Sequence, residues 1–297
     1  MLFHRQQLLL ALLDSLGGDV ASLDFQKLLF LHCREQEEPA YEFVPYRFGG
    51  FSFTSYADKR KLIAGEMLAE TPKRWMLTEK GKQTGRKDPV LCLTVGKTAK
   101  RYRGLRGDAL VAEAYRLDPY YATRSEMAER LFAETPKELE AIRLAAPKPG
   151  KPGICTIGYE GRSLEAYLNR LLLDGITLLC DVRRNPLSRK YGFSKAALSN
   201  ACEGVGIGYE HLPQLGIDSE ARKDLKTQAD YDALFADYEK NDLPHQSSAL
   251  AKIHGWVEKG HRVALTCYEH LPYQCHRHCV ANALQRDFGM KLKAKHL

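Results

Sequence analysis

The stretch that decides the fold is HRVALTCYEHLPYQCHRHC, residues 261–279, which has the pattern of a β-strand running directly into a helix start. Residues 262–267 are mainly apolar, and residues 267–279 place an acid, thiols, imidazoles and a guanidinium within thirteen positions. In α/β proteins ligands collect at strand-to-helix turns, because helix N–H groups and side chains converge there. The stretch therefore predicts both an α/β fold and a functional site at one end of its sheet.

The rest of the second half continues the alternation of strands and helices. We expect strands at 154–157, 176–182, 207–212 and 262–267, with a last strand near 292–296. Between them we expect helices that Ser163 and Ser194 cap, and helices at 230–239, 249–259 and 276–288. Alternating βα units imply a mostly parallel sheet with helices on both faces, and such sheets bind ligands at the carboxyl ends of their strands.

A proline-rich stretch, residues 145–153 (AAPKPGKPG), separates the two halves of the chain. Prolines cannot continue a helix and make a semi-rigid spacer. A length of 297 residues also favours two domains. The sequence therefore predicts domains at 1–146 and 153–297.

The first half predicts helices near 5–16, 24–36 and 55–70, and a strand near 75–77. Three motifs, at 25–31 (FQKLLFL), 46–52 (YRFGGFS) and 77–81 (LTEKG), resemble the winged-helix domains of some prokaryotic antitoxin-like and regulatory proteins. The resemblance implies an α-rich, winged-helix-like domain with its wing after residue 75. Winged helices, like helix-turn-helix proteins, place a helix in the major groove of DNA.

Residues 73–106 hold eleven Lys or Arg side chains against two acids, which is a plausible footprint for phosphates. The predicted DNA-binding residues are Lys80, Lys82, Arg86, Lys87, Lys100, Arg101 and Arg103. Two alternatives stay open: a solvated basic loop, and a winged helix used only for protein contacts.

Composition favours a cytoplasmic globular protein. Hydrophobic residues make up 44% of the chain, and no apolar run reaches the roughly 18 residues of a membrane span. The eight cysteines are scattered as single residues, which argues against a disulfide framework. Only Cys267, Cys275 and Cys279 cluster, and we expect the other five to be core residues.

Five spaced motifs of the second half occur in a characteristic order. They are Gly158-Tyr-Glu-Gly, Asp181-Val-Arg with Ser188-Arg189, Phe193, Tyr209-x-His211-Leu-Pro, and Cys267-x-Glu269 with Cys275-His-Arg277. Over about 153–290 this pattern resembles the family catalogued as domain of unknown function 488. The chain departs from it at Ile217, where a second glycine is common, and at 158–161, where Gly-His-Ser is frequent. The resemblance implies a fold and a site, but no established reaction.

The candidate catalytic residues lie at the predicted strand ends. Asp181 follows an apolar strand and Glu269 lies two residues after Cys267, so either carboxylate could serve as acid or base. His211 or His276 could protonate a leaving base. The structural alternatives are an ion pair of Asp181 with Arg183 or Arg277, and a helix-capping role for Glu269.

The candidate ligand-binding residues surround the same strand ends. Arg183, Arg189 and Arg277 supply planar guanidinium groups that match phosphate oxygens, unless they form salt bridges within the protein. Tyr159 and Tyr268 could stack on a base extruded from DNA. Glu160 completes the first loop.

Cys275 precedes a helix start beside His276 and Arg277, a setting that favours a reactive thiolate. The alternatives are a buried structural thiol, and zinc held with Cys267 and Cys279. Because paired Cys-x-x-Cys modules are absent, we predict no metal and no cofactor. Phosphate-loop, serine-elbow and dinucleotide motifs are absent too.

These residues predict a DNA-directed enzyme that hydrolyses the N-glycosidic bond of a modified base, with phage defence as its setting. Glu269 or Asp181 would stabilise an oxocarbenium-like centre or activate water. One alternative is a winged-helix regulator whose α/β domain senses a nucleotide, and the other is a thiol enzyme that uses Cys275. The expected partner is DNA rather than a membrane, and the oligomeric state stays open.

Overall fold

The structure is a computed structural model that describes residues 2–218, 220–222, 225–289 and 294–297. Its internal contacts divide the chain into two compact units, Met1–Ala146 and Pro147–Leu297. The division falls within the proline-rich stretch. Each unit has its own buried core, and the two are described separately.

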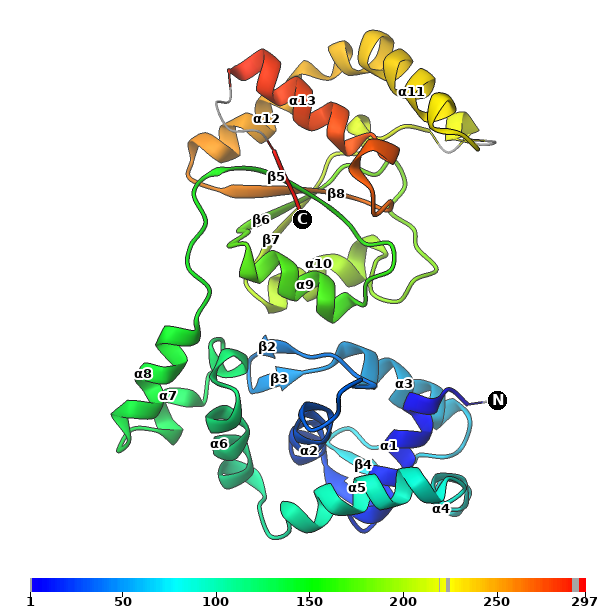
Figure 1. Ribbon diagram of the computed structural model, residues 1–297, viewed down its shortest axis with the longest axis vertical. Coiled ribbons are helices and arrows are strands. Elements are labelled where there is room, and N and C mark those ends of the chain that lie inside the picture. Colours follow the sequence, from blue (N-terminus) through cyan, green and yellow to red (C-terminus); the bar gives the residue numbers. More distant parts are fainter. Residues whose placement is uncertain (1, 219, 223–224, 290–293) are drawn as a thin grey trace. The chain divides into compact units, whose positions relative to one another are not determined.

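The C-terminal unit is built on a five-stranded parallel sheet in the order β7-β6-β8-β5-β9 (Figure 1). The strands are β5 (Gly153–Gly158), β6 (Leu178–Asp181), β7 (Gly208–His211), β8 (Arg262–Cys267) and β9 (Lys295–His296). Gly158 pairs with Cys267, and Asp181 pairs with Thr266. The carboxyl ends of the three central strands β6, β8 and β5 therefore lie level at one edge of the sheet.

Helices cover both faces of this sheet, which confirms the predicted α/β class. In Figure 1, α9 (Leu164–Leu173) and α10 (Lys195–Gly204) lie on one face, and α12 (Ser247–Glu258) and α13 (Arg277–Phe288) lie on the other. α11 (Gln228–Asp237) lies beyond α13 on that second side. Every residue of β5 and β6 is buried, because strands covered on both faces lose their polar alternation.

Short helical turns complete the unit, at Pro213–Leu215, Glu220–Arg222, Tyr238–Asp242, Leu243–Gln246 and Pro272–Gln274. The Ser163 hydroxyl caps α9 by accepting from the amide of Ala166 at 2.9 Å, as predicted. The Ser194 hydroxyl instead bonds to the backbone of Ser188. The last strand is Lys295–His296, and residues 292–293 of the segment predicted as this strand lie outside the described residues.

The N-terminal unit is mainly helical. Its helices are α1 (His4–Ser15), α2 (Ser22–Arg34), α3 (Phe53–Ala64), α4 (Glu79–Gly85), α5 (Pro89–Arg101), α6 (Gly107–Leu117), α7 (Ala128–Leu131) and α8 (Pro136–Ala145), with a turn at Pro119–Ala122. Two small antiparallel sheets pair β1 (Asp19–Ala21) with β4 (Arg74–Met76) and β2 (Val44–Tyr46) with β3 (Gly49–Phe51). Phe25 of α2 stacks on Trp75 of β4 at 4.3 Å, which joins the central helix to a sheet.

The segment after β4 differs from the predicted wing. The Thr78 hydroxyl caps α4 by accepting from the amide of Gly81, and the Asp88 carboxylate caps α5 in front of Pro89. These caps make residues 79–101 two helices rather than a basic loop. α3 also ends at Ala64, six residues before the predicted end, where Gly65 caps it and Glu66 takes a positive φ.

Of the helices in the described part of the chain, none combines the length and the apolar character needed to cross a bilayer.

Candidate active site

A cavity of about 290 Å³ opens at the carboxyl ends of β5, β6 and β8. Its lining comes from the loops that follow these strands and from the start of α13. The polar members with chemistry to offer are Tyr159, Arg183, Arg184, Ser188, Arg189, Arg222, Cys267, Tyr268 and His276. The cavity therefore occupies the edge where a parallel sheet binds ligands.

Cys267 and His276 form a thiol–imidazole pair in this cavity. The Cys267 Sγ lies 3.8 Å from Nδ1 of His276, and both residues are buried. Nε2 of the same ring lies 3.0 Å from the carbonyl oxygen of Val182, which can only accept a hydrogen bond. The ring therefore carries its proton on Nε2 when neutral, and presents the lone pair of Nδ1 to the thiol.

The two neighbouring thiols, Cys267 and Cys275, have opposite pKa shifts. A hydrogen bond from Cys275, together with the charges of His276 and Arg222, holds the pKa of Cys267 well below its usual range. Burial and the adjacent Cys267 raise the pKa of Cys275 well above it. Of these two thiols, Cys267 is therefore the one that loses its proton more readily, whereas the sequence predicts Cys275 as the candidate reactive thiol.

Two features of the structure count against a reactive thiolate at Cys275 and favour the alternative of a buried structural thiol. The residue has no exposed surface, and it ends a short helical turn rather than lying at the first turn of α13, where helix N–H groups would stabilise a thiolate. Cys267 ends β8 in register with Gly158 at the ligand-binding edge. The sequence alone places Cys267 at the end of a predicted strand, and this is the signal that could have identified it as a site residue.

Glu269 lies behind the cavity wall. Its carboxylate forms an ion pair with Arg222, and it accepts a hydrogen bond from Cys267, at 3.4 Å, when that residue is in its thiol form. The side chain is buried and is not part of the cavity lining. Because Arg222 neutralises Glu269, the carboxylate opposes a thiolate at Cys267 less than a free carboxylate would.

Asp181 lies in a buried ion pair with Arg183. The Arg183 Nε and Nη2 atoms donate to the two carboxylate oxygens at 2.8 and 2.5 Å, and the Tyr209 hydroxyl donates to Oδ2 at 2.7 Å. Asp181 has no exposed surface and does not line the cavity. Of the two ion pairs considered from the sequence, the structure forms the one with Arg183.

Arg183 and Tyr159 form the inner wall. The Arg183 Nη1 donates to the Tyr159 hydroxyl and to the carbonyl of Phe193, both at 2.9 Å. The Phe193 ring stacks on Tyr159 at 4.3 Å and covers one face of the phenol ring. Tyr268, by contrast, is 45% exposed, so its ring is the better platform for a ligand.

Three other predicted residues connect loops instead of lining the cavity. Arg277 is 1% exposed and donates to the carbonyls of Glu269 and His270 at 2.6 and 2.9 Å. His211 donates from Nε2 to the carbonyl of Arg183 at 2.9 Å. Glu160 accepts from the amide of His270 at 2.9 Å. These side chains hold the cavity walls in place, and the ligand prediction for Arg277 and Glu160 has no support in this geometry.

Two arginines at the cavity rim have no carboxylate partner among the described residues. They are Arg184 and Arg189, both exposed. Sequence reasoning selected Arg189 and missed Arg184 and Arg222. Arg222 belongs to the short helical turn Glu220–Arg222, which none of the five sequence motifs includes.

The model of the family described as Domain of unknown function DUF488 matches residues 163–284. The C-terminal unit carries a DUF488 domain. This confirms the resemblance inferred from its motifs, and the matched range contains Arg183, Cys267 and His276. No curated protein and no solved structure matches the chain. The winged-helix resemblance of the first half stays a prediction.

Two side-chain groups in the described part of the DUF488 domain could hold a metal ion. In one, the ligand atoms of Cys267, Cys275 and His276 lie within 4.8 Å of one another, and in the other those of Glu239, His278 and Cys279 do. Thiolate and imidazole are the ligands that zinc prefers. Zinc binding and a reactive thiol are therefore competing uses of Cys267.

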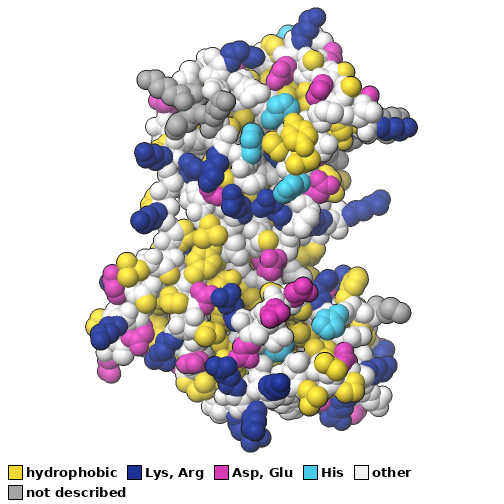
Figure 2. Space-filling view, in the orientation of Figure 1, with side chains coloured by type: hydrophobic (Ala, Val, Ile, Leu, Met, Phe, Trp, Pro, Cys, Tyr) yellow, Lys and Arg dark blue, Asp and Glu magenta, His cyan; other side chains and the backbone are white. Residues whose placement is uncertain are grey.

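Most of the predicted DNA-binding side chains of the N-terminal unit have acidic partners. Lys80 pairs with Glu66, Lys82 with Glu79, Arg86 with Asp14 and Arg101 with Glu35. Lys87, Lys100 and Arg103 have no acidic partner among the described residues. Figure 2 shows Lys and Arg side chains interspersed with Asp and Glu over the face in view, so the positive charge there is divided.

Proposed function

We propose that the DUF488 domain is a thiol enzyme that acts on a phosphate-bearing substrate. The observation that carries the proposal is the place of Cys267. Its sulfur lies in an arginine-lined cavity, 3.8 Å from an imidazole nitrogen that can take its proton. A thiolate beside a positioned imidazole is the arrangement of a covalent nucleophile.

The charge of the cavity supports an anionic substrate. Arg184 and Arg189 lie at the rim, Arg222 lies near the thiol, and no carboxylate lines the cavity in the described part of the chain. Guanidinium groups match phosphate oxygens with two parallel hydrogen bonds. A phosphate held by these side chains brings its phosphorus toward Cys267.

The reaction proposed is phosphate-ester hydrolysis in two steps. His276 takes the proton of Cys267, the sulfur attacks phosphorus, an S–P bond forms, the P–O ester bond breaks, and the leaving oxygen takes that proton back from His276. Water then attacks phosphorus, the S–P bond breaks, inorganic phosphate leaves, and His276 accepts the proton of the water. The arginines stabilise the charge on the equatorial oxygens in both steps.

A panel of nucleotides and of oligonucleotides with terminal phosphates tests this proposal. Released phosphate and the mass of the denatured protein are measured together, since a trapped intermediate adds one phosphoryl group to the peptide that contains Cys267. Cys267→Ser should abolish release, and Cys275→Ser should retain most of it. Equal activity in the Cys267→Ser variant would refute the assignment.

Hydrolysis of an N-glycosidic bond is the second candidate function. What favours it is the Glu269 carboxylate, which contacts Cys267 and Arg222, two side chains of the cavity. Release of free base from modified DNA that is lost in Glu269→Gln and kept in Cys267→Ser would select this function. Ligand binding with no turnover of any substrate would instead identify a sensing domain of a regulator.

The proposal includes DNA as the polymer that carries the phosphate group on which the enzyme acts. Among the predicted DNA-binding residues, Lys87, Lys100 and Arg103 lack an acidic partner in the described part of the chain, so their charges are free to contact phosphates. If they bind DNA, replacing all three by Gln lowers the salt dependence of affinity by about 2–3 units of slope. The free thiol state of all eight cysteines supports a cytoplasmic setting.

A further inference from the structure

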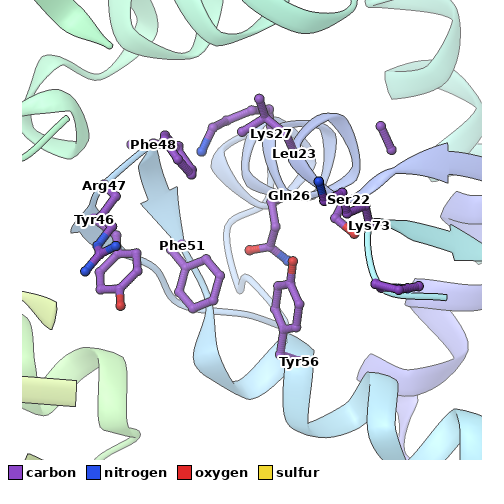
Figure 3. A pocket seen from close by; sticks show the side chains of 13 residues that line it. Ser22, Leu23, Gln26, Lys27, Tyr46, Arg47, Phe48, Phe51, Tyr56 and Lys73 are labelled. Carbon is purple, nitrogen blue, oxygen red and sulfur yellow. The ribbon is translucent and has the colours of Figure 1, made fainter. Parts of the chain in front are cut away.

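The N-terminal unit contains a cavity of about 430 Å³ between α2 and the β2–β3 hairpin (Figure 3). Helix α2 contributes Ser22, Leu23, Gln26 and Lys27 to one side. The hairpin and α3 contribute the aromatic residues of the other side. In Figure 3 these two sets of side chains face one another across the opening.

The aromatic side is a continuous row of rings. Tyr46 stacks on Phe51 with centroids 5.0 Å apart and an interplanar angle of 27°. Phe51 stacks on Tyr56 at 5.1 Å and 29°. Aromatic rings prefer offset stacking on other planar groups, so this row favours a planar ligand.

Lys27 is a buried cation in the lining of the cavity. The side chain is 2% exposed, and its Nζ donates to the carbonyl of Gly50 at 2.9 Å. This leaves two of its three N–H bonds without an acceptor among the described residues. Burial lowers the pKa of Lys27 to about 7. A buried ammonium with unused donors is costly unless an anion joins it.

The remaining charges of the cavity have the same sign. Arg47 and Lys73 also line it, and no carboxylate does within the described part of the chain. The nearest acid of α2 is Asp24, whose carboxylate accepts from the amide of Gly107 at 2.8 Å. The cavity thus combines a planar apolar wall with a positive charge, and the chemistry complementary to both is an aromatic ring that carries an anion.

We propose that this cavity is a binding site for a small planar aromatic anion. The ring of the ligand lies against Tyr46, Phe51 and Tyr56, and its carboxylate or phosphate accepts hydrogen bonds from Lys27. The site belongs to the N-terminal unit and does not depend on the function of the DUF488 domain. It makes the first half of the chain a ligand-responsive unit in addition to any role in binding DNA.

Isothermal titration of the full chain with matched probes tests the site. The probes are β-naphthoate and β-naphthyl phosphate as anions, β-naphthylmethanol as the neutral analogue, and β-naphthylmethylammonium as the cation. We expect the anions to bind at least about tenfold more tightly than the alcohol, and the cation not to bind, since one charge-assisted hydrogen bond is worth about a factor of ten or more. The preferred anion tells whether a carboxylate or a phosphate is the natural group.

Lys27→Met is the decisive variant, and Lys73→Met is its matched control at an exposed cation of the same lining. The first should bind the alcohol and the naphthoate equally, and the second should change the preference by less than about threefold. Far-ultraviolet circular dichroism checks that both variants fold. Equal affinity for anion and alcohol in the unaltered protein, an unchanged preference in Lys27→Met, or no binding of any probe overturns the proposal. If no probe binds, a side chain of a partner protein would be a better candidate than a small molecule for the occupant of the cavity.

A second measurement needs no variant. At pH 8 the free Lys27 amine is mainly neutral, so binding of an anion should take up a proton, and binding of the alcohol should not. The other ionisable groups near the cavity are Tyr46, Arg47, Tyr56, Lys59 and Lys73. Titration in two buffers of different ionisation enthalpy measures the uptake. Absence of proton uptake on binding of β-naphthoate would contradict the role of Lys27.

Discussion

Gly158 lies directly beside the carbonyl group of Glu269, so closely that a Cβ at position 158 would overlap it. The same carbonyl accepts a hydrogen bond from Arg277. The end of β5 and the loop after β8 are therefore packed backbone to backbone, and this contact sets the position of the loop that carries Tyr268 and Glu269. The last residue of a strand here determines the shape of the cavity wall.

Gly158→Ala should displace this loop. We expect a loss of about 1–3 kcal/mol in the free energy of unfolding, as for other overpacked sites, and slower alkylation of Cys267. Urea unfolding and mass-spectrometric labelling measure the two effects. The matched control is Gly255→Ala within α12, where a Cβ meets no atom within 4 Å and should be neutral or stabilising. Similar behaviour of the two variants would contradict the close contact.

Alkylation by iodoacetamide should separate the two neighbouring thiols. Because the pKa of Cys267 is lowered well below its usual range, its labelling rate should fall less between pH 8 and pH 6 than the rates of the other thiols. The rates of cysteines whose pKa is raised, such as Cys275 and Cys202, should fall about tenfold per pH unit. Inorganic phosphate should protect Cys267 if the arginines bind it. Faster labelling of Cys275 than of Cys267 would reverse the assignment.

Asp181→Asn should lower the stability of the DUF488 domain, and any loss of catalytic activity should come with that loss of stability. It leaves the buried Arg183 guanidinium without its counter-charge, and breaking one side of a buried ion pair costs about 3–5 kcal/mol. Thermal unfolding checks this. The double variant Asp181→Leu, Arg183→Met removes both charges and should recover part of the loss. If the double variant regains no stability, the ion pair stabilises the fold through its hydrogen bonds and packing as well as through charge neutralisation.

Arg184→Gln and Arg189→Gln should each weaken phosphate binding by about tenfold without changing stability, since both side chains are exposed and lack acidic partners among the described residues. Titration with inorganic phosphate measures the affinity. Arg286→Gln is the control, because that exposed arginine pairs with Asp287 on α13, outside the cavity. An equal effect of the control substitution would indicate general electrostatics instead of a site.

The pH dependence of stability should reveal Lys27. Its pKa is about 7 in the folded chain and near the ordinary value when unfolded, so the unfolded chain binds the extra proton between these values. Stability should therefore rise with pH above 7, by up to about 1.4 kcal/mol per pH unit, and the penalty of the buried charge is fully present below 7. Lys27→Met should raise Tm more at pH 6 than at pH 9. Identical shifts at both pH values would mean that Lys27 does not titrate in this range.

The architecture of the DUF488 domain could be predicted from its sequence because buried parallel strands are short apolar runs between helical periods. Strand β8 was predicted at its observed bounds, and the cluster of polar residues at the strand ends was found from the same rule. What the sequence could not tell was which polar residue faces the cavity. Asp181 and Arg277 point to neighbouring groups of the protein, and that depends on packing between segments far apart in the chain.

In the N-terminal unit, too, the sequence predicts helices better than it predicts contacts between distant segments. Its helices α1 and α2 follow from their apolar periodicity, but the two helices that Thr78 and Asp88 cap were not predicted. The cavity beside Lys27 was not predicted. A lysine on a helix is normally an exposed residue, and only the close approach of the Gly49–Phe51 strand buries it.

The Tyr268 carbonyl accepts hydrogen bonds from the amides of both Tyr159 and Glu160, at 3.1 and 2.9 Å. Sheet-like bonding thus continues past the ends of β5 and β8 into the loops that carry the two tyrosines. A ligand meets a wall that is already ordered, so little conformational entropy is lost when it binds. Ligands should accordingly enter without a slow rearrangement of the wall. Differences in affinity between ligands should then appear mainly in their dissociation rate constants.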